Sequence, residues 1–394
     1  MTRTTIREVT GEELVEIVHP LPAYAFRSSP PLVDKLDRAE AVKRREGDRY
    51  IAAFEGDTVI ACAASAPLTQ NVRGKLFGMA GIHDVTTDPT ARRQGYAKRV
   101  LKHLYAAVRE EGRSLSCLYP FRESFYERLG YVNFPQPRSA KFAPAPLQHL
   151  LERDLGGSVD RVLLADGYDV FRNYMVKIRP LVHGLAVFDY YDSIGPKRSN
   201  YWLAVARVAG EPVGLMVYDL KGDNITQFTM RAPFFYYHTS RGKYLLLAWI
   251  ARHIDQACQI ELLLSPAEQP ETWVEDLHVT VESAFIAPMG RVLDVAAMAG
   301  MRTGPGRFTA RLRDPICPWN EGVWQFATEN GALQVSRAAD AECDLSMQAV
   351  SALVYGTQDP SDFALRGWGA PAPDVEQRMR SMFPPLLPYL HEHF

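Results

Sequence analysis

The sequence predicts an α+β protein built from several domains. Three observations favour this fold class: strands and helices alternate in the first third of the chain, a later segment repeats the same hairpin-then-helix order, and proline clusters separate the segments. The length of 394 residues suits roughly two to three domains. We place the expected domains at residues 1–145, 146–286 and 287–394.

Composition excludes several classes of protein. The 44 Lys and Arg nearly balance the 46 Asp and Glu, so we expect no nucleic-acid partner. The N-terminus is polar, and no run reaches the about 18 apolar residues of a membrane helix. We therefore expect no signal peptide and no membrane contact, and we place the protein in the cytoplasm. The five scattered cysteines contain no Cys-x-x-Cys pair, which favours neither a disulfide framework nor a metal site.

The first segment begins with a helix and continues as a sheet. Apolar residues on one face predict a helix over residues 10–19. Residues 50–54 and 58–64 flank a Glu-Gly-Asp turn and therefore predict a β-hairpin. A further strand is expected over residues 75–85.

The most informative run joins that strand to a helix. The strand ends near Thr87, a basic loop leads to Gly95, and Gly112 is well placed to end the helix that follows. One face of this helix is apolar, through Ala97, Val100, Leu101, Leu104 and Val108. A helix start offers unpaired backbone N–H groups and partial positive charge, and a glycine allows close approach, which together suit a pyrophosphate. The alternative is an ordinary basic helix N-terminus with a glycine turn.

Two motifs carry a resemblance to a known family. The run Arg92-Arg93-Gln94-Gly95-Tyr96-Ala97 resembles the Arg/Gln-x-x-Gly-x-Gly/Ala signature of the GCN5-related N-acetyltransferases. About 30 residues later, a predicted strand over 114–119 is followed by Phe125-Tyr126 and Gly130-Tyr131, which resembles the family's Phe-Tyr-x-x-x-Gly-Tyr pattern. The chain length and the run Leu118-Tyr119-Pro120-Phe121 resemble the enhanced intracellular survival (Eis) family.

The Eis resemblance implies a specific architecture and cosubstrate. It implies two tandem acetyltransferase-like domains, the second degenerate, followed by a C-terminal domain like sterol carrier proteins. It also implies acetyl-CoA as cosubstrate, with the loop amides on the pyrophosphate and the strand backbone on the pantetheine arm. From the cysteine pattern we expect no metal. In this sequence the resemblance implies the following coenzyme-binding residues: Val85, Thr86, Thr87, Arg92, Arg93, Gln94, Gly95, Tyr96, Ala97, Lys98, Phe121 and Arg122.

Acetyl transfer to an amine requires a base, an oxyanion donor and an acid. A phenol is protonated at neutral pH, so we assign Tyr126 as the acid that protonates the leaving thiolate, and the backbone N–H near Val85 as the oxyanion donor. The resemblance implies the C-terminal carboxylate of Phe394 as the base. His83 and Asp84 are the alternatives, and because strand side chains alternate, we expect only one of them to face the pocket.

Five residues are candidates for binding the substrate. Tyr24, Phe26 and Tyr119 are candidate substrate residues by position, together with His83 and Asp84. The resemblance implies aminoglycosides, acetylated at more than one amine, and a homo-hexamer. Two alternatives stay open: acetylation of protein lysines or a polyamine, and a regulator that binds coenzyme or lipid without turnover.

The second segment reads as a degraded copy of the first. A predicted hairpin flanks Gly210-Glu211, and Arg241-Gly242-Lys243-Tyr244 opens an apolar helix. Tyr244 replaces the small residue of the motif, and the arginine directly precedes the glycine, so we expect no coenzyme there.

The third segment predicts a strand around residues 308–312 and a helix over 345–355. An apolar tail over 383–390 follows, and Phe394 is the last residue. Because termini are usually polar and loose, we expect this tail to dock on the protein.

Overall fold

The computed structural model describes residues 4–27, 39, 43, 45, 47–190, 199–283 and 286–394. Two compact units divide the chain. The first comprises Met1–Phe134, His183–Asp192 and Pro288–Phe394, and the second comprises Pro135–Val182 and Ser193–Ala287. No helix among the described residues is long and apolar enough to cross a membrane.

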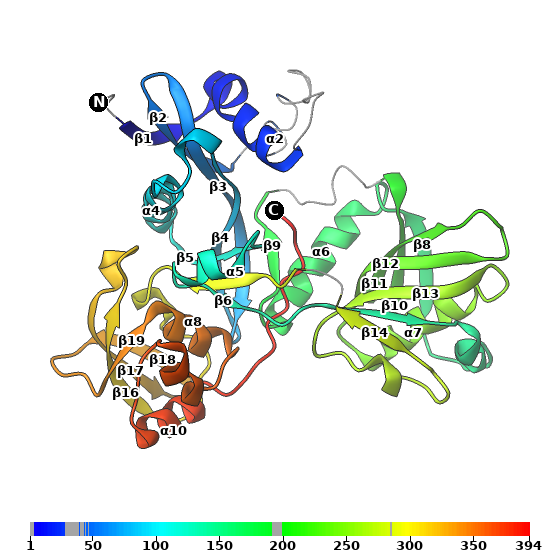
Figure 1. Ribbon diagram of the computed structural model, residues 1–394. Coiled ribbons are helices and arrows are strands. Elements are labelled where there is room, and N and C mark those ends of the chain that lie inside the picture. The colour runs from blue at the N-terminus through cyan, green and yellow to red at the C-terminus, as the bar shows by residue number, and fades with distance from the viewer. Residues whose placement is uncertain are drawn as a thin grey trace. The chain divides into compact units, whose positions relative to one another are not determined.

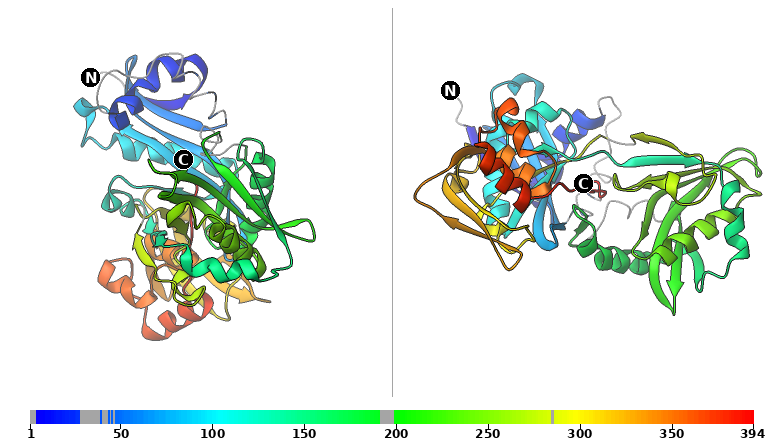
Figure 2. Two further views of the ribbon diagram at one scale, coloured as in Figure 1. Left: turned by 90° about the vertical axis from the view of Figure 1, so that its right-hand side faces the viewer. Right: turned by 90° about the horizontal axis from the view of Figure 1, so that it is seen from below.

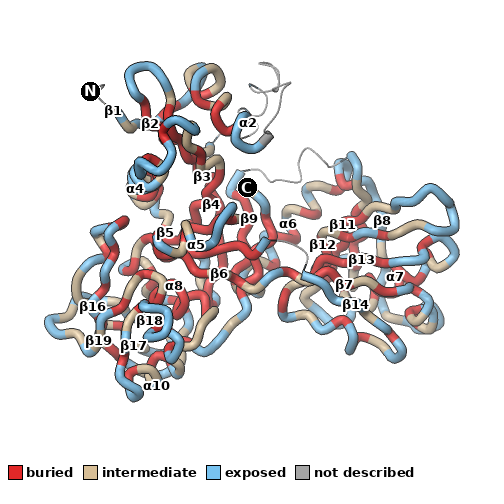
Figure 3. Tube along the Cα trace, in the orientation of Figure 1, coloured by how far each residue is buried: buried red, intermediate tan, exposed pale blue. Residues whose placement is uncertain are grey.

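The first unit is built on an eight-stranded sheet with the order β1-β2-β3-β4-β5-β15-β6, in which β9 also pairs with β3. Its strands are β1 (Thr4–Val9), β2 (Arg49–Glu55), β3 (Thr58–Val72), β4 (Lys75–Thr87), β5 (Arg113–Leu118), β6 (Val132–Asn133), β9 (Ala186–Phe188) and β15 (Met289–Val292). The predicted hairpin and the strand after it are confirmed as β2, β3 and β4. Figure 3 shows β3 and β4 as largely buried strands.

Several helices belong to the same part of the chain, and α2 (Pro20–Arg27) and α4 (Tyr96–Glu110) pack against the central strands of this sheet. The other helices are α1 (Gly11–Glu13), η1 (Leu14–Val18), η2 (Pro89–Ala91) and α5 (Glu123–Glu127). The helix predicted over 10–19 is confirmed as α1 followed by the π-helical turn η1. The amphipathic helix is confirmed as α4, which packs against β2, β3 and β4 through residues such as Val100 and Leu104 (Figures 1 and 2).

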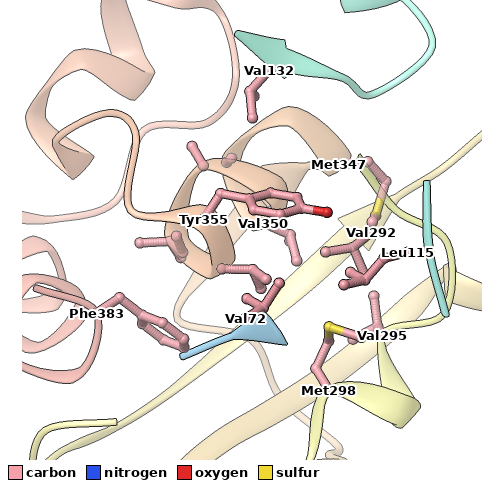
Figure 4. Packing of buried hydrophobic residues seen from close by; sticks show 14 of the residues in the cluster. Val72, Leu115, Val132, Val292, Val295, Met298, Met347, Val350, Tyr355 and Phe383 are labelled. Carbon is pink, nitrogen blue, oxygen red and sulfur yellow. The ribbon is translucent and has the colours of Figure 1, made fainter. Parts of the chain in front are cut away.

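The C-terminal part of the first unit forms a four-stranded sheet with the order β18-β17-β16-β19. Its elements are η7 (Ala296–Met298), β16 (Arg307–Arg313), η8 (Pro318–Asn320), β17 (Gly322–Glu329), β18 (Ala332–Arg337), β19 (Cys343–Ser346), α8 (Met347–Tyr355), η9 (Pro360–Asp362), α9 (Phe363–Arg366) and α10 (Pro373–Met382). The predicted strand and helix are confirmed as β16 and α8. One hydrophobic core joins this part to the eight-stranded sheet, since Tyr355 and Phe383 pack with Val72 and Val292 (Figure 4).

The second unit has a seven-stranded sheet with the order β14-β7-β13-β12-β11-β10-β8. Its elements are β7 (Arg138–Phe142), η3 (Ala145–Glu152), β8 (Ser158–Leu163), α6 (Tyr168–Ile178), η4 (Arg179–Leu181), β10 (Trp202–Val208), β11 (Glu211–Lys221), β12 (Phe228–Tyr237), α7 (Ser240–Ala251), β13 (Ala257–Leu264), η6 (Pro270–Thr272) and β14 (Thr280–Ser283). The predicted hairpin and apolar helix are confirmed as β10, β11 and α7.

The compact units differ from the domains expected at 1–145, 146–286 and 287–394. Strand β7 falls in the expected first domain, yet it pairs with β13 and β14 of the second unit. Strand β15 falls in the expected third domain, yet it pairs with β5 and β6 of the first unit. Hydrogen-bonded pairing therefore crosses boundaries that proline clusters and composition had suggested.

Candidate active site

The centre of the site is the point where β4 and β5 stop pairing. These parallel strands pair as far as Ile82 and Leu118, whereas β4 itself continues to Thr87. On its other side β4 stays paired with β3 as far as Thr87. Residues 83–87 therefore present a strand edge that β5 does not use, with backbone N–H and C=O groups available to an extended ligand.

A β-bulge interrupts β4 at the same place. His83 is opposite Ala64 and Thr86 is opposite Cys62, so β4 has one more residue than β3 between these pairs. Asp84 takes up the extra residue with a φ of 51°. A bulge cancels the alternation of side chains along a strand. The prediction that only one of His83 and Asp84 faces the pocket is therefore wrong: both residues line the same cavity, and their side chains lie 3.4 Å apart.

This cavity has a volume of about 240 Å³ and lies entirely within the first unit. It brings together the predicted acid, Tyr126, and the residue of the predicted base, Phe394. Its lining is formed by Phe26, Arg45, Ile82, His83, Asp84, Val85, Tyr119, Phe121, Tyr126 and Phe394. Tyr24 lies exposed on α2 and is not among the lining residues.

His83 is surrounded by charged groups. Its Nε2 lies 2.9 Å from Oδ2 of Asp48, and its Nδ1 lies 3.4 Å from Oδ2 of Asp84 and 2.7 Å from Nη1 of Arg45. Burial by itself lowers the pKa of His83, but the charge of Asp84 and the contacts with both carboxylates outweigh burial and raise the pKa above its usual value. Because both ring nitrogens already have partners, His83 is poorly placed to accept a proton from a substrate.

Asp84 supplies a fixed negative charge. Burial opposes ionisation, but His83 and Arg45 outweigh it, and with a bond from the Tyr50 hydroxyl at 3.2 Å they lower the pKa of Asp84 below its usual range. Asp84 therefore stays ionised at physiological pH. A general base works best when its pKa lies near the operating pH, so Asp84 suits the binding of a cation better than proton abstraction.

Tyr126 is held by an aromatic cluster. Its side chain is 4% exposed, and its ring lies 4.9 Å from that of Phe125, 5.7 Å from that of Phe121 and 5.9 Å from that of Tyr131, between centroids. Burial raises the pKa of Tyr126 above its usual value, so the phenol keeps its proton at neutral pH. Among the described residues the hydroxyl has no hydrogen-bond partner, which leaves it available as a donor to a ligand.

The start of α4 has the features of an anion site. Gly95 is the N-cap, with a φ of 80° and no side-chain cap, and a Cβ added there would meet no atom within 4 Å. Arg92, Arg93 and Lys98 are exposed around this opening. These features fit a pyrophosphate, because unpaired N–H groups, open space and positive charge coincide.

The other members of the predicted coenzyme set differ in what they offer. The Tyr96 side chain is buried and its hydroxyl donates to Glu55 at 2.7 Å, so only its backbone is available to a ligand. Thr86 is likewise buried, and its hydroxyl lies 3.0 Å from Sγ of Cys62. The remaining members are Val85 and Thr87 on β4, the exposed Gln94, the half-buried Ala97, and the exposed Phe121 and Arg122.

The corresponding helix start in the second unit is closed. The Gly242 N–H donates to the Thr239 side chain at 3.0 Å, and a Cβ on Gly242 would lie 2.3 Å from the Val213 carbonyl oxygen. The Lys243 ammonium lies 5.5 Å from the ring centroids of Tyr237 and Tyr244. Gly242 therefore serves close packing of α7 on β11, which gives a physical reason for expecting no coenzyme at this degenerate copy.

The predicted docking of the tail is confirmed. Tyr389, Leu390, His391 and Glu392 are buried, and Phe394 lies against β4, where a Cβ on Gly81 would be 2.8 Å from its ring. Tyr119, predicted as a substrate residue, also contacts this tail: its hydroxyl donates to the Leu390 carbonyl oxygen at 3.3 Å.

Sequence reasoning missed several residues of the site. Two of them, Ile82 and Arg45, line the cavity. Asp48 contacts His83, and the Tyr50 hydroxyl donates to Asp84. Ile82 and Tyr50 are in predicted strands, and their pattern indicates only burial. Arg45 and Asp48 lie before β2 in a segment without periodicity, so no sequence signal was available for them.

Comparisons with known proteins agree with this geometry. The acetyltransferase (GNAT) domain family matches residues 5–133, and the sterol carrier protein domain family matches residues 295–391. No curated protein matches the sequence.

Solved structures show the same fold over the whole chain. A GCN5-related N-acetyltransferase from Anabaena variabilis ATCC 29413 has 17% identity and a TM-score of 0.81, with 100% of both chains covered. A probable N-acyltransferase from Enterococcus faecalis V583 has 18% identity and a TM-score of 0.84, also with 100% of both chains covered. Eis1 from Mycobacterium abscessus has 16% identity and a TM-score of 0.78, covering 99% of this chain and 100% of that chain.

The family matches confirm the predicted acetyltransferase domain in the N-terminal part and the predicted sterol-carrier-like domain in the C-terminal part, and the solved structures share the fold of the chain. The family matches identify the chain as an N-acetyltransferase with a GNAT domain in its N-terminal part and a sterol carrier protein domain in its C-terminal part.

Proposed function

We propose that the protein transfers the acetyl group of acetyl-CoA to a primary amine that enters the cavity as an ammonium ion. One observation carries this proposal: a single cavity joins Tyr126, Phe394 and the unpaired edge of β4 at Val85. The fixed charge of Asp84 and the aromatic lining favour a cationic substrate.

The coenzyme would lie along β4 and the start of α4. Its pyrophosphate would bind the backbone N–H groups after Gly95, with Arg92 and Arg93 adding positive charge. Its pantetheine arm would pair with the open edge at residues 85–87. When bound, acetyl-CoA supplies the thioester whose carbonyl carbon is attacked.

The reaction balances with the groups in the cavity. The Phe394 carboxylate takes a proton from the ammonium, and the neutral amine attacks the thioester carbonyl carbon to form a C–N bond. The N–H of Val85 donates to the oxyanion. The C–S bond then breaks, Tyr126 donates its proton to the thiolate, and the second proton leaves the amide nitrogen and restores the Tyr126 phenol. The family resemblance suggests the Phe394 carboxylate as the base, and the partners on both ring nitrogens of His83 support this choice over His83.

We propose aminoglycosides, acetylated at more than one amine, as the substrate class, with polyamines and protein lysines as alternatives. The family resemblance suggests aminoglycosides, and the charge of Asp84 supports any of these cations equally. We also propose a homo-hexamer from the same resemblance. Light scattering tests it, and a monomer would count against it.

Thiol release from acetyl-CoA tests the function. Wild type, Tyr126→Phe and a chain lacking Phe394 are compared on several aminoglycosides, a polyamine and a lysine peptide. Turnover of an amine by wild type, strongly reduced in both variants, is the expected result. Tight binding of acetyl-CoA without turnover of any amine would instead support the non-catalytic regulator.

A further inference from the structure

The C-terminal strap, which we define as residues 384–394, packs against the rest of the first unit. It follows α10, has neither helix nor strand, and is buried over residues 389–392. Figure 1 shows it as the red segment that leaves α10 and ends at the C label. Three sets of contacts hold it, each from a different part of the fold.

Arg73 makes the first set. It lies in the turn between β3 and β4, and its side chain is 5% exposed. Its guanidinium donates to the carbonyl oxygens of Val354, Leu353 and Pro384, each at 2.9 Å. The first two carbonyls end α8, and the third begins the strap. Burial lowers the pKa of Arg73 to about 10, so it stays charged at neutral pH and can bind all three acceptors.

His183 makes the second set. Its carbonyl oxygen accepts the Tyr389 N–H at 2.8 Å. Its Nδ1 accepts the Arg73 N–H at 3.2 Å, and its Nε2 lies 2.8 Å from the Tyr355 carbonyl oxygen. Burial lowers the pKa of His183 to about 4, which leaves the ring neutral, as the acceptor role of Nδ1 requires. The next residue, Gly184, leaves space for the strap, since a Cβ there would lie 2.6 Å from the Tyr389 nitrogen.

The third set lies beside the cavity. The Tyr119 ring stacks on His393 with 4.5 Å between centroids, and the Phe394 ring lies 5.8 Å away. Gly81 has no side chain to obstruct the Phe394 ring. Lys75, the first residue of β4, is six residues before Gly81, which corresponds to about 20 Å along the strand. The strap is thus held at Pro384 by Arg73, at Tyr389 by His183 and at His393 by Tyr119.

We infer that Arg73 and His183 are positioning residues, which fix the distant end of the strap so that the Phe394 carboxylate enters the cavity. This inference rests on the proposed role of that carboxylate as the base. Neither residue lines the cavity, so neither contacts the substrate, and their link to the site is the bonds to Pro384 and Tyr389 of the strap. A displacement of the strap at Tyr389 is expected to reach Phe394, which is only five residues further along the chain.

The test is a double-mutant cycle on the full chain. Arg73→Lys keeps the positive charge but loses the planar fork that reaches three carbonyls. It is combined with deletion of Phe394, and kcat and KM are measured by thiol release with an accepted amine. Gly184→Ala provides a second way to disturb the strap. Arg380→Lys is the control, because the Arg380 guanidinium binds the carboxylates of Asp359 and Glu376 rather than carbonyl oxygens of the strap.

Two further readouts separate docking from folding. Thermal unfolding shows whether each variant is folded. Release of C-terminal residues by carboxypeptidase, followed by mass spectrometry, reports directly whether the strap is docked. Arg73→Lys and Gly184→Ala are expected to accelerate release of Phe394, whereas Arg380→Lys is expected to match wild type.

Arg73→Lys is expected to lower kcat by about 10- to 100-fold with little change in KM for acetyl-CoA, as for a displaced catalytic group. In the chain lacking Phe394 the same substitution should change the residual rate less than about twofold, because its route of action is gone. An equal loss in both backgrounds would assign Arg73 a merely structural role and overturn the inference. So would folded variants with wild-type kcat and a protected strap.

The cycle also separates this inference from the proposed base. Wild-type kcat in the chain lacking Phe394 would refute the carboxylate as base, and with it the catalytic purpose of the strap. A large loss on deleting Phe394, together with wild-type kcat in folded Arg73→Lys and Gly184→Ala, would keep the base and refute the positioning role. If Arg73→Lys does not fold, Gly184→Ala decides the question alone.

Discussion

Two tyrosines five residues apart give a matched test of the acid. Tyr126 lines the cavity and its hydroxyl has no partner among the described residues, whereas Tyr131 is fully buried outside the cavity. The Tyr131 hydroxyl lies 2.6 Å from Oγ of Ser116 and 2.9 Å from the hydroxyl of Tyr105. Replacing each tyrosine by phenylalanine removes the same atom from two different surroundings.

The two substitutions should have opposite effects on stability and on kcat. Tyr126→Phe breaks no protein hydrogen bond, so the free energy of unfolding should change by less than about 0.5 kcal/mol. Loss of a general acid should lower kcat by about 10²- to 10⁴-fold. Tyr131→Phe leaves buried hydroxyls without a partner and should cost about 1–3 kcal/mol of stability. Its kcat should stay within a few-fold of wild type.

Thermal or urea unfolding measures the free energy of unfolding, and thiol release from acetyl-CoA measures kcat. Comparable loss of kcat in both variants would mean that the aromatic cluster as a whole matters and that Tyr126 has no special role. A Tyr126→Phe variant with full kcat would refute its assignment as the acid.

Three further predictions follow from the site. Gly95→Ala should weaken acetyl-CoA binding, measured by calorimetry, and should lower the free energy of unfolding by about 1 kcal/mol because Gly95 has a positive φ. Gly242→Ala should lower the free energy of unfolding by about 1–3 kcal/mol, because the added Cβ would meet the Val213 carbonyl oxygen. Asp84→Asn should raise KM for a cationic amine about tenfold with kcat retained, and lost kcat with unchanged KM would identify Asp84 as the base. Burial lowers the pKa of His183 to about 4 and that of His391 to about 3, so below the unfolded value of about 6.5 only the unfolded chain binds these protons. As the pH is lowered from about 6.5 to about 4, the free energy of unfolding should therefore fall by about 1.4 kcal/mol per pH unit for each histidine. Unfolding curves measured over this pH range should show a smaller slope for His183→Gln, and an unchanged slope would contradict the prediction.

The sequence predicted the parts of the site that local patterns encode. The spacing of Val100 and Leu104 marked the buried face of α4, and the basic loop with Gly95 marked its N-terminus. The apolar tail indicated docking, and Tyr126 followed from a family motif over residues 125–131, which begins in the short helix α5. Each of these features depends on residues that are close together in the chain.

The remaining parts depend on pairing between distant segments. The bulge at Asp84 arises from the register of β3 on β4, so strand alternation gave the wrong expectation for His83 and Asp84. Arg45 reaches the cavity from a segment without periodicity. The unit boundaries also differ from the expected ones because β7 and β15 pair outside their sequence segments. No local pattern records such long-range pairings.

The most direct test of the central claim counts acetyl-CoA molecules bound per chain, by calorimetric titration of the intact protein. One open helix start at Gly95 and one closed start at Gly242 predict a single site per chain, weakened by Gly95→Ala. Two sites per chain, or a single site that survives Gly95→Ala with unchanged affinity, would contradict the assignment of the coenzyme to the first acetyltransferase domain.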